Sequence, residues 1–251
     1  MRPPEEVDRV RELARGGLNH CQIARITGIP RGTIRDWVNG KVRHPRVGGC
    51  PACGHPEHDF SALPAKQYAY LLGIYLGDGT ISKAPKRVWK LRIFQDIRYP
   101  QIIREIADAI AAVMPANRVH VYEYARGANM AEISSQSRSW PCLFPQHGPG
   151  MKHTRKIELT AWQWAYVWQE PGMFVRGLIH SDGCRVSNKV WQGKYAYPRY
   201  FFSNESLDIQ QLFRDACDII GVEYANNRRN SISVAPRDSV AKLDEIVGPK
   251  R

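Results

Sequence analysis

Two short segments of this chain repeat one pattern, in which an apolar, helix-like run ends in an aspartate followed by a glycine. The copies occupy residues 71–79 and 175–183, and their aspartates are Asp78 and Asp182. The aspartates are 182 − 78 = 104 positions apart, which is about the length of one small domain. The repeat therefore predicts two similar halves that each bring one carboxylate to a shared place.

Each copy also carries two small residues four positions apart, namely Gly73 with Gly77 and Gly177 with Ser181. Residues at this spacing share one helix face, so two such helices can touch backbone to backbone. We expect this packing to place the two aspartates side by side at the C-terminal helix ends. The helix dipole and the second carboxylate disfavour charge there by about 0.3–1 kcal/mol each or more. A divalent cation between the carboxylates would reverse that balance.

The residues between and after the two copies repeat one order of elements. The first half is expected to contain strands over 80–83 and 88–95, a helix over 99–113, strands over 118–124 and 130–134, and a closing helix over 161–168. The second is expected to contain strands over 184–190 and 199–203, a helix over 206–220, strands over 222–226 and 231–234, and a closing helix over 238–247. In this alignment residues 94–96 match residues 202–204. Each half is thus about a hundred residues of α+β structure.

Over roughly residues 65–248, this pattern resembles the LAGLIDADG homing endonuclease family in its single-chain, two-motif form. The resemblance implies an α+β fold built from a pseudo-twofold pair of αββαββα subdomains that form a DNA-binding saddle. It also implies a monomer that hydrolyses phosphodiester bonds in double-stranded DNA. Asp78 and Asp182 would be ligands of Mg²⁺ or another divalent cation, whose hard character suits carboxylate oxygens.

The resemblance implies further polar and basic residues near the metal. Gln95 and Asp96 fit the position at the end of an early strand, and Ser203 and Asn204 fit it in the second half. The basic residue before each closing helix would be Lys156 in the first half and Arg237 in the second. Arginine departs from the lysine that is frequent there, and it can stabilise phosphate charge but cannot readily relay a proton.

Other interpretations of the repeated motif stay open at this stage. A single Asp-Gly pair is often only a turn that ends a helix, although two matched copies favour a shared site. Some bacterial transcription regulators combine this fold with a helix-turn-helix and do not cleave DNA, and an RNA-splicing maturase is a third alternative. Because both acidic positions are aspartate, we favour the nuclease over the regulator.

Residues 7–38 predict three short helices, over 7–16, 20–26 and 30–38. Their expected core is Ile23, Ala24, Ile29, Ile34 and Trp37, with Gly28 in a tight turn. The string from Gln22 to Trp37 resembles a helix-turn-helix motif. Its third helix would present Arg31, Thr33 and Arg35 to the major groove of DNA. The alternative is a plain helical hairpin with a solvated basic face.

Residues 43–63 read as a linker that is rich in Gly, Pro and His. It contains Cys50, Cys53, His55 and His58, which have the chemistry of a small structural zinc site. A four-ligand site within nine residues would be cramped, so Cys142 or His147 could complete it from outside. The alternative is a reduced thiol pair in a linker.

The chain carries a formal net charge of +12 over 251 residues, which favours a polyanionic partner such as nucleic acid. The outward face of the sheets is expected to contribute DNA-binding residues, chiefly Lys86, Lys90, Arg92, Lys189, Arg199, Arg228 and Arg229. Neither a signal peptide nor a membrane-spanning run is evident. Scattered cysteines fit a reducing interior, so a cytoplasmic, nucleoid-associated bacterial protein is expected.

These patterns divide the chain into four parts: a helix-turn-helix domain (1–42), the linker (43–63), a first LAGLIDADG-like half (64–160) and a second (161–251). Trp162, Trp164 and Trp168 lie at helical spacing, and we expect them to be packing residues rather than platforms for stacked bases.

Overall fold

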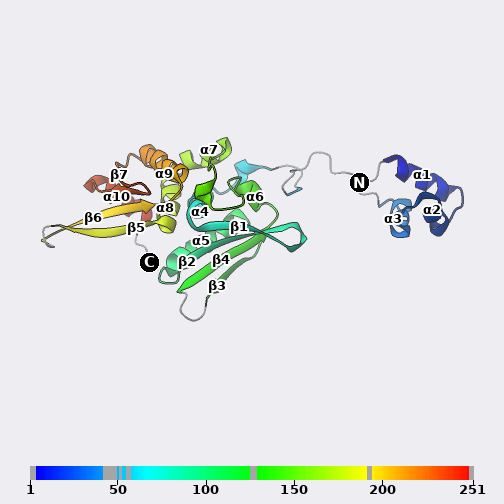
Figure 1. Ribbon diagram of the computed structural model, residues 1–251, viewed down its shortest axis with the longest axis horizontal. Helices are drawn as coiled ribbons and strands as arrows, with labels where there is room; N and C mark the ends of the chain where they lie inside the picture. The colour runs from blue at the N-terminus through cyan, green and yellow to red at the C-terminus, as the bar shows by residue number, and fades with distance from the viewer. Residues whose placement is uncertain are drawn as a thin grey trace. The chain divides into compact units, whose positions relative to one another are not determined.

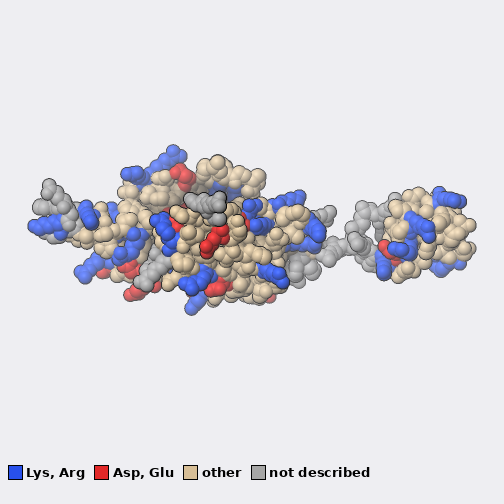
Figure 2. Space-filling view, turned by 90° about the horizontal axis from the view of Figure 1, so that it is seen from below, with Lys and Arg blue, Asp and Glu red and all other residues tan. Residues whose placement is uncertain are grey.

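The computed structural model describes residues 4–41, 50, 53–54, 58–124, 129–190 and 194–248. The chain divides into two compact units, Met1–Gly49 and Cys50–Arg251 (Figure 1). Lys and Arg outnumber Asp and Glu on the face of both units that Figure 2 shows. Among the helices of the described part, none is both long and apolar enough to cross a lipid bilayer.

Unit 1 consists of the helices α1 (Pro4–Arg15), α2 (His20–Thr27) and α3 (Arg31–Val38). Asn19 begins α2 with a capping box, because its side chain accepts from the backbone of Gln22 while the Gln22 side chain accepts from the Asn19 backbone. Gly28 ends α2 with φ of 66°, a conformation that glycine adopts cheaply. The buried core contains Val10, Ile23, Ile29 and Ile34. The three expected helices and their core are therefore present.

Unit 2 contains two successive halves of like construction. The first consists of α4 (Ala65–Asp78), β1 (Gly79–Ala84), β2 (Val88–Asp96), α5 (Pro100–Val113), β3 (Val119–Glu123), β4 (Met130–Ser137), α6 (Trp140–Leu143) and α7 (Ala161–Gln169). Short 3-10 turns lie at η1 (Phe60–Ala62), η2 (Pro85–Arg87) and η3 (Lys152–Thr154). The second half consists of α8 (Pro171–Asp182), β5 (Gly183–Val190), β6 (Tyr195–Ser203), α9 (Leu207–Ile220), β7 (Ala225–Arg228), β8 (Ser231–Val234) and α10 (Arg237–Val247).

Each half forms one antiparallel four-stranded sheet, with strand order β1-β2-β4-β3 in the first and β5-β6-β8-β7 in the second. The two orders are the same when the strands are numbered within each half. The αββαββα order, found twice in unit 2, confirms the α+β fold class that the repeat predicts. The additional elements are the short α6 and the 3-10 turns, for which the sequence shows no periodic signal.

One predicted strand begins later than expected. β7 starts at Ala225 rather than at Val222, because Gly221 and Val222 form the cap that ends α9. Gly221 has φ of 65°, and the Val222 N–H donates to the carbonyl of Cys217 at 2.9 Å. This is the bond pattern of a glycine-terminated helix, and it buries the Val222 side chain.

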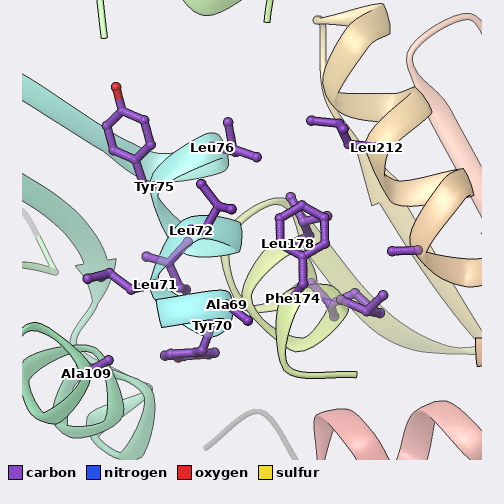
Figure 3. Packing of buried hydrophobic residues seen from close by; sticks show 14 of the residues in the cluster. Ala69, Tyr70, Leu71, Leu72, Tyr75, Leu76, Ala109, Phe174, Leu178 and Leu212 are labelled. Carbon is purple, nitrogen blue, oxygen red and sulfur yellow. The ribbon is translucent and has the colours of Figure 1, made fainter. Parts of the chain in front are cut away.

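The helices α4 and α8 lie side by side in the middle of unit 2 (Figure 3). A Cβ placed on Gly73 would lie 2.4 Å from the carbonyl oxygen of Phe174, and one on Gly177 would lie 2.2 Å from that of Tyr70. Real Cβ atoms do not come so close, so only glycine fits at either place. The helices therefore touch backbone to backbone, and large side chains such as Leu72 and Leu178 are buried around this contact.

A half-buried ion pair also joins the two halves. The guanidinium of Arg176 on α8 donates to the carboxylate of Glu105 on α5 at 2.7 and 2.8 Å. The same guanidinium donates to the carbonyls of Ile246 and Val247 at the end of α10. One side chain of α8 therefore contacts α5 of the first half and α10 of the second.

Candidate active site

The two aspartates of the repeat end the two paired helices, Asp78 at the end of α4 and Asp182 at the end of α8. A Cβ placed on Gly77 would lie 2.8 Å from Oδ2 of Asp182, so the Asp182 carboxylate reaches the residue that precedes Asp78. The structure thus brings together the two carboxylates that the sequence singled out. Their position follows from the small residues, which allow the helix ends to approach.

Each carboxylate accepts a hydrogen bond from an amide of its own half. Gln95 on β2 donates from Nε2 to Oδ2 of Asp78 at 2.9 Å, and Asn204 after β6 donates from Nδ2 to Oδ2 of Asp182 at 2.6 Å. Gln95 is 6% exposed, which fixes its amide in place. The two amides are equivalent in the two halves, and each donates to the carboxylate that ends the first helix of its half.

The strand pairing corrects the alignment of the two halves by one residue. Gly79 pairs with Ile93, whereas Gly183 pairs with Phe202. Residues 93–95 therefore match residues 202–204, and not residues 94–96 as the sequence alignment had it. The correction matters because a shift of one residue turns a side chain to the other face of a strand. Asp96 lies outside the site and binds Arg98 through its carboxylate.

Lys152 is a site residue that the sequence reasoning missed. Its ammonium donates to the carbonyl oxygens of Tyr75 at 2.6 Å and of Gly77 at 2.7 Å. Burial lowers the pKa of Lys152 to about 8, while Asp182 and Asp78 act to raise it. The lysine thus contacts the C-terminal end of α4 and is electrostatically coupled to both aspartates. It lies in η3 of a non-periodic segment, where only its type and its place before the closing helix could have indicated it.

The two basic residues expected next to the site lie elsewhere. The exposed Lys156 forms an ion pair of 2.5 Å with Glu158, and this contact raises its pKa. Arg237 is the exposed first residue of α10. Neither lines the cleft at the helix ends, and the structure places Lys152 where the sequence reasoning expected Lys156.

A cleft with a volume of about 450 Å³ opens at the ends of α4 and α8. Residues of both halves line it, together with the segment between β4 and α7: Gly77, His147, Lys152, Arg155, Asp182 and Asn204 are among them. The segment between β4 and α7 belongs to the first half, and residues 194–248 of the second half, which the structure describes, contain no segment of similar length at the equivalent place. In the second half, β8 and α10 are separated by just Ala235 and Pro236, so the two halves differ most at this place.

The basic residues of the first sheet share one face. Lys90 and Arg92 alternate on β2 with the buried Leu91 and Ile93, and so point away from the core. Lys90 forms an ion pair of 2.6 Å with Glu132. Arg92 donates to Ser82 at 2.7 Å.

In the second sheet, Lys189 and Arg199 lie on opposite faces, although both were expected on the outward face from the sequence. Arg199 pairs with Val186, and Lys189 pairs with Ala196. Counting along β5, Lys189 falls on the same face as the core residues Tyr200 and Phe202, whereas Arg199 lies on the opposite face. The expectation that both share the outward face is therefore wrong, because side chains alternate along a strand.

The remaining predicted DNA-contacting residues are mostly exposed. Their side chains lie in η2, on β7 and the turn after it, and on α3: Lys86, Arg228, Arg229, Arg31 and Arg35 are exposed, and Thr33 is half-buried. Arg31 and Arg35 are four residues apart and share one side of α3. Of the three tryptophans expected to pack, Trp168 is 70% exposed, which contradicts that expectation for this residue.

The cysteine-containing linker contributes a second cluster. Cys50, Cys53, His58 and Cys142 place their ligand atoms within 4.8 Å of one another, which is consistent with a structural zinc site. Burial and the neighbouring thiols raise the pKa of Cys142. Of the two outside residues that could complete the cluster, Cys142 does so. His55 lies outside the described residues.

No protein-family profile matches the sequence, and no curated protein matches it. Three solved structures illustrate the similarity of the fold. Variants of the homing endonuclease I-DmoI align with 13% identity over 74% of this chain and 97% of that chain, at a TM-score of 0.45. The homing endonuclease I-WcaI, bound to its DNA recognition sequence, aligns with 14% identity over 75% and 83%, also at 0.45. The N-terminal LAGLIDADG domain of DUF199/WhiA aligns with 11% identity over 76% and 87%, at 0.43.

Proposed function

We propose that unit 2 is a metal-dependent endonuclease that hydrolyses phosphodiester bonds in duplex DNA, and that unit 1 adds sequence recognition through α3. The observation that carries this proposal is the placement of Asp78 and Asp182 at the ends of two helices in backbone contact. An amide from its own half holds each carboxylate. Two acids at the negative ends of two adjacent helix dipoles are costly unless they serve a cation.

The donor set suits Mg²⁺ or a similar hard divalent cation. Carboxylate oxygens are its preferred protein ligands, and Asp78 and Asp182 are the residues that would hold it. A bound divalent cation supplies an activated water and neutralises the charge on a leaving oxygen.

The protein's own groups then have distinct roles. The amides of Gln95 and Asn204 orient the two carboxylates, as outer partners of metal ligands do. Lys152 places a positive charge at the helix ends, where a phosphate would approach. Because its pKa is about 8, Lys152 can hold or release a proton near neutral pH, and it can therefore protonate a leaving oxygen.

The DNA-binding part of the proposal rests on charge and on strand alternation. The chain carries a formal net charge of +12, and Lys90, Arg92 and Arg199 lie on the outward sheet faces. Neutralisation of phosphates by such residues makes binding fall steeply with salt. Because one chain supplies both carboxylates, we propose that a monomer is active. Light scattering of the complex with DNA measures its stoichiometry.

A cleavage screen tests the proposal without knowledge of the target sequence. The protein is incubated with a long, complex duplex library in Mg²⁺, in Mn²⁺ and in EDTA, and new DNA ends are sequenced. We expect ends at a restricted set of sequences in the presence of metal only. Ends that persist in Asp78→Asn/Asp182→Asn, or no ends at all while DNA is bound, would overturn the nuclease.

One observation favours a second candidate, a DNA-binding regulator that does not cleave. The Lys152 ammonium is coupled to both aspartates and bonded to the end of α4, so it supplies part of the positive charge that a cation would bring. If Lys152 satisfies the acidic pair by itself, DNA selected from a random library is bound equally well with and without Mg²⁺ and stays uncut.

A further inference from the structure

The cluster of Cys50, Cys53, His58 and Cys142 joins two segments that are far apart in the sequence. Cys50 and Cys142 are 92 positions apart, yet their sulfur atoms lie 3.5 Å from each other. The sulfur of Cys53 lies 3.2 Å from Nε2 of His58. All four residues are half-buried, so the cluster is enclosed by protein but open to an ion from solution.

The Cys50–Cys142 spacing is close to the edge of a zinc coordination tetrahedron, and the Cys53–His58 spacing of 3.2 Å is somewhat shorter. With Zn–S bonds of about 2.3 Å and Zn–N bonds of about 2.0–2.1 Å, tetrahedral geometry places neighbouring ligand atoms roughly 3.5–3.8 Å apart. The Cys50–Cys142 separation of 3.5 Å has this size. It is far longer than the roughly 2.05 Å of a disulfide, so the two sulfur atoms are not joined by a disulfide.

A backbone hydrogen bond connects the start of the Cys-x-x-Cys segment with the glycine that follows it. The N–H of Gly54 donates to the carbonyl of Cys50 at 2.7 Å, and Gly54 has φ of 73°. This turn brings the ends of the Cys-x-x-Cys pair together, and a residue with a side chain would be strained at Gly54. The glycine after the second cysteine is thus explained by the cluster.

The other two ligands are held by rigid surroundings. Cys142 lies on α6 between the buried Trp140 and Leu143. The ring of His58 stacks on Phe60 at 5.1 Å, and Phe60 stacks on Trp162 of α7 at 4.1 Å. Pre-positioned ligands lose little entropy when an ion binds, which favours a real site over a chance gathering of thiols.

We propose that Cys50, Cys53, His58 and Cys142 bind one Zn²⁺, and that this ion fastens Cys50, Cys53 and His58 to α6 of the first half. The proposal goes beyond the DNA chemistry and does not depend on it. Three sulfurs and one imidazole are soft and borderline ligands, which select zinc over Mg²⁺. Four protein ligands fill the tetrahedron, so the site is structural. Each thiol gives its proton to solvent as the Zn–S bond forms.

The location of the site explains what the ion would do. Cys50 is the first residue of unit 2, so a metal bound there would lie at the start of that compact unit. Zinc would hold Cys50, Cys53 and His58 against α6 of the body that carries the acidic pair. We therefore expect the ion to stabilise unit 2 and to have no direct part in catalysis.

Metal analysis of the whole chain tests the proposal. Protein purified without added metal is expected to carry about one zinc per chain. Replacement by Co²⁺ is expected to give sulfur-to-metal charge-transfer bands and the intense visible bands of tetrahedral cobalt. Cys142→Ser and His58→Ala are expected to lose the zinc, whereas Cys21→Ser and Cys184→Ser, which change exposed cysteines elsewhere, keep it. A chain that is folded, free of zinc and unable to bind added Zn²⁺ or Co²⁺ overturns the proposal.

A stability measurement gives a second readout if the variants fold poorly. A zinc-selective chelator is expected to lower the Tm of the wild-type chain and to speed amide exchange at Cys53, Gly54 and His58 and in α6. Added Zn²⁺, but not Mg²⁺, restores both. Asp78→Asn/Asp182→Asn keeps its zinc and its chelator response, so failure of the nuclease and failure of the zinc site are told apart. Absence of any chelator effect on wild-type protein that contains zinc contradicts the fastening role.

Discussion

Gly177 lies so close to Tyr70 that a methyl group in place of its hydrogen would sit 2.2 Å from the Tyr70 carbonyl oxygen. The reciprocal contact, between Gly73 and the carbonyl of Phe174, is similar at 2.4 Å. These atoms belong to helix backbones, which cannot move without separating α4 from α8. The position of the two acidic residues at the ends of these helices therefore depends on two glycines near their middles.

Gly177→Ala is expected to destabilise unit 2 by about 3 kcal/mol or more, at the upper end of the cost of overpacking a core. The matched control is Gly172→Ala on the same helix, where the new Cβ would lie 3.4 Å from a methyl group of Ile246, an ordinary contact. Its effect is expected to stay below about 1 kcal/mol. Urea unfolding compares the two, and equal effects would show that the helices are not in backbone contact.

Asp78→Asn is expected to abolish cleavage and to leave DNA binding intact, because it removes one of the two proposed metal ligands and adds no bulk. It also removes one of two neighbouring negative charges at a helix C-terminus, so the metal-free protein should become slightly more stable. Asp96→Asn, which changes an acid paired with Arg98 outside the site, is the control and keeps its activity. Cleavage, gel-shift and thermal unfolding assays measure the three quantities. A marked loss of stability in metal-free Asp78→Asn would contradict the proposed repulsion.

Gln95→Ala is expected to lower cleavage about 10–100-fold, the usual cost of losing an outer partner of a metal ligand. The affinity for DNA should change little, because Gln95 is buried. Its neighbour Asp96 lies on the other face of β2, and Asp96→Ala should leave the rate nearly unchanged. Single-turnover cleavage over a series of Mg²⁺ concentrations separates weaker metal binding from a slower step. If Asp96→Ala lowered the cleavage rate more than Gln95→Ala, the match of residues 94–96 with residues 202–204 would be the correct one.

The fold could be read from the sequence largely because it is repeated. Two copies of the glycine and aspartate pattern, each followed by the same periodicities, predicted the helices α4 and α8 and the contact between them. The match of Gln95 with Asn204 could not be found, because the hairpin of the second half is longer and only strand pairing sets its register. Lys152 could not be found because it lies in a non-periodic segment. The carbonyl groups that it contacts, those of Tyr75 and Gly77, lie 77 and 75 positions earlier in the chain. The sequence left Cys142 and His147 as alternative outside ligands. Sequence spacing does not reveal that Cys142 of α6 lies against Cys50.

Lys152 should make the stability of unit 2 depend on pH in the alkaline range. Its folded-state pKa of about 8 lies below the ordinary value of 10.5, so the unfolded chain holds the proton more tightly. The free energy of unfolding should therefore rise as the pH increases from about 8 toward 10.5, by up to about 3 kcal/mol. Lys152→Met removes this rise, whereas Lys156→Met, at an exposed lysine, keeps it. Urea unfolding between pH 7 and 9.5 avoids the range in which tyrosines ionise. A flat wild-type profile contradicts the burial of this ammonium.

Arg199 and Lys189 allow a test of which sheet face binds DNA in the second half. The two side chains belong to paired strands but lie on opposite faces, since Arg199 is opposite Val186 and Lys189 is opposite Ala196. If the outward face contacts phosphates, Arg199→Ala weakens binding and reduces the slope of log K against log salt by about 1. Lys189→Ala removes the same charge from the other face, so the slope should stay near that of the wild type. Measurement of DNA affinity at several salt concentrations gives both slopes. Equal losses would show that net charge matters and not the face, and a loss confined to Lys189→Ala would place the DNA on the side of the sheet that carries Tyr200 and Phe202.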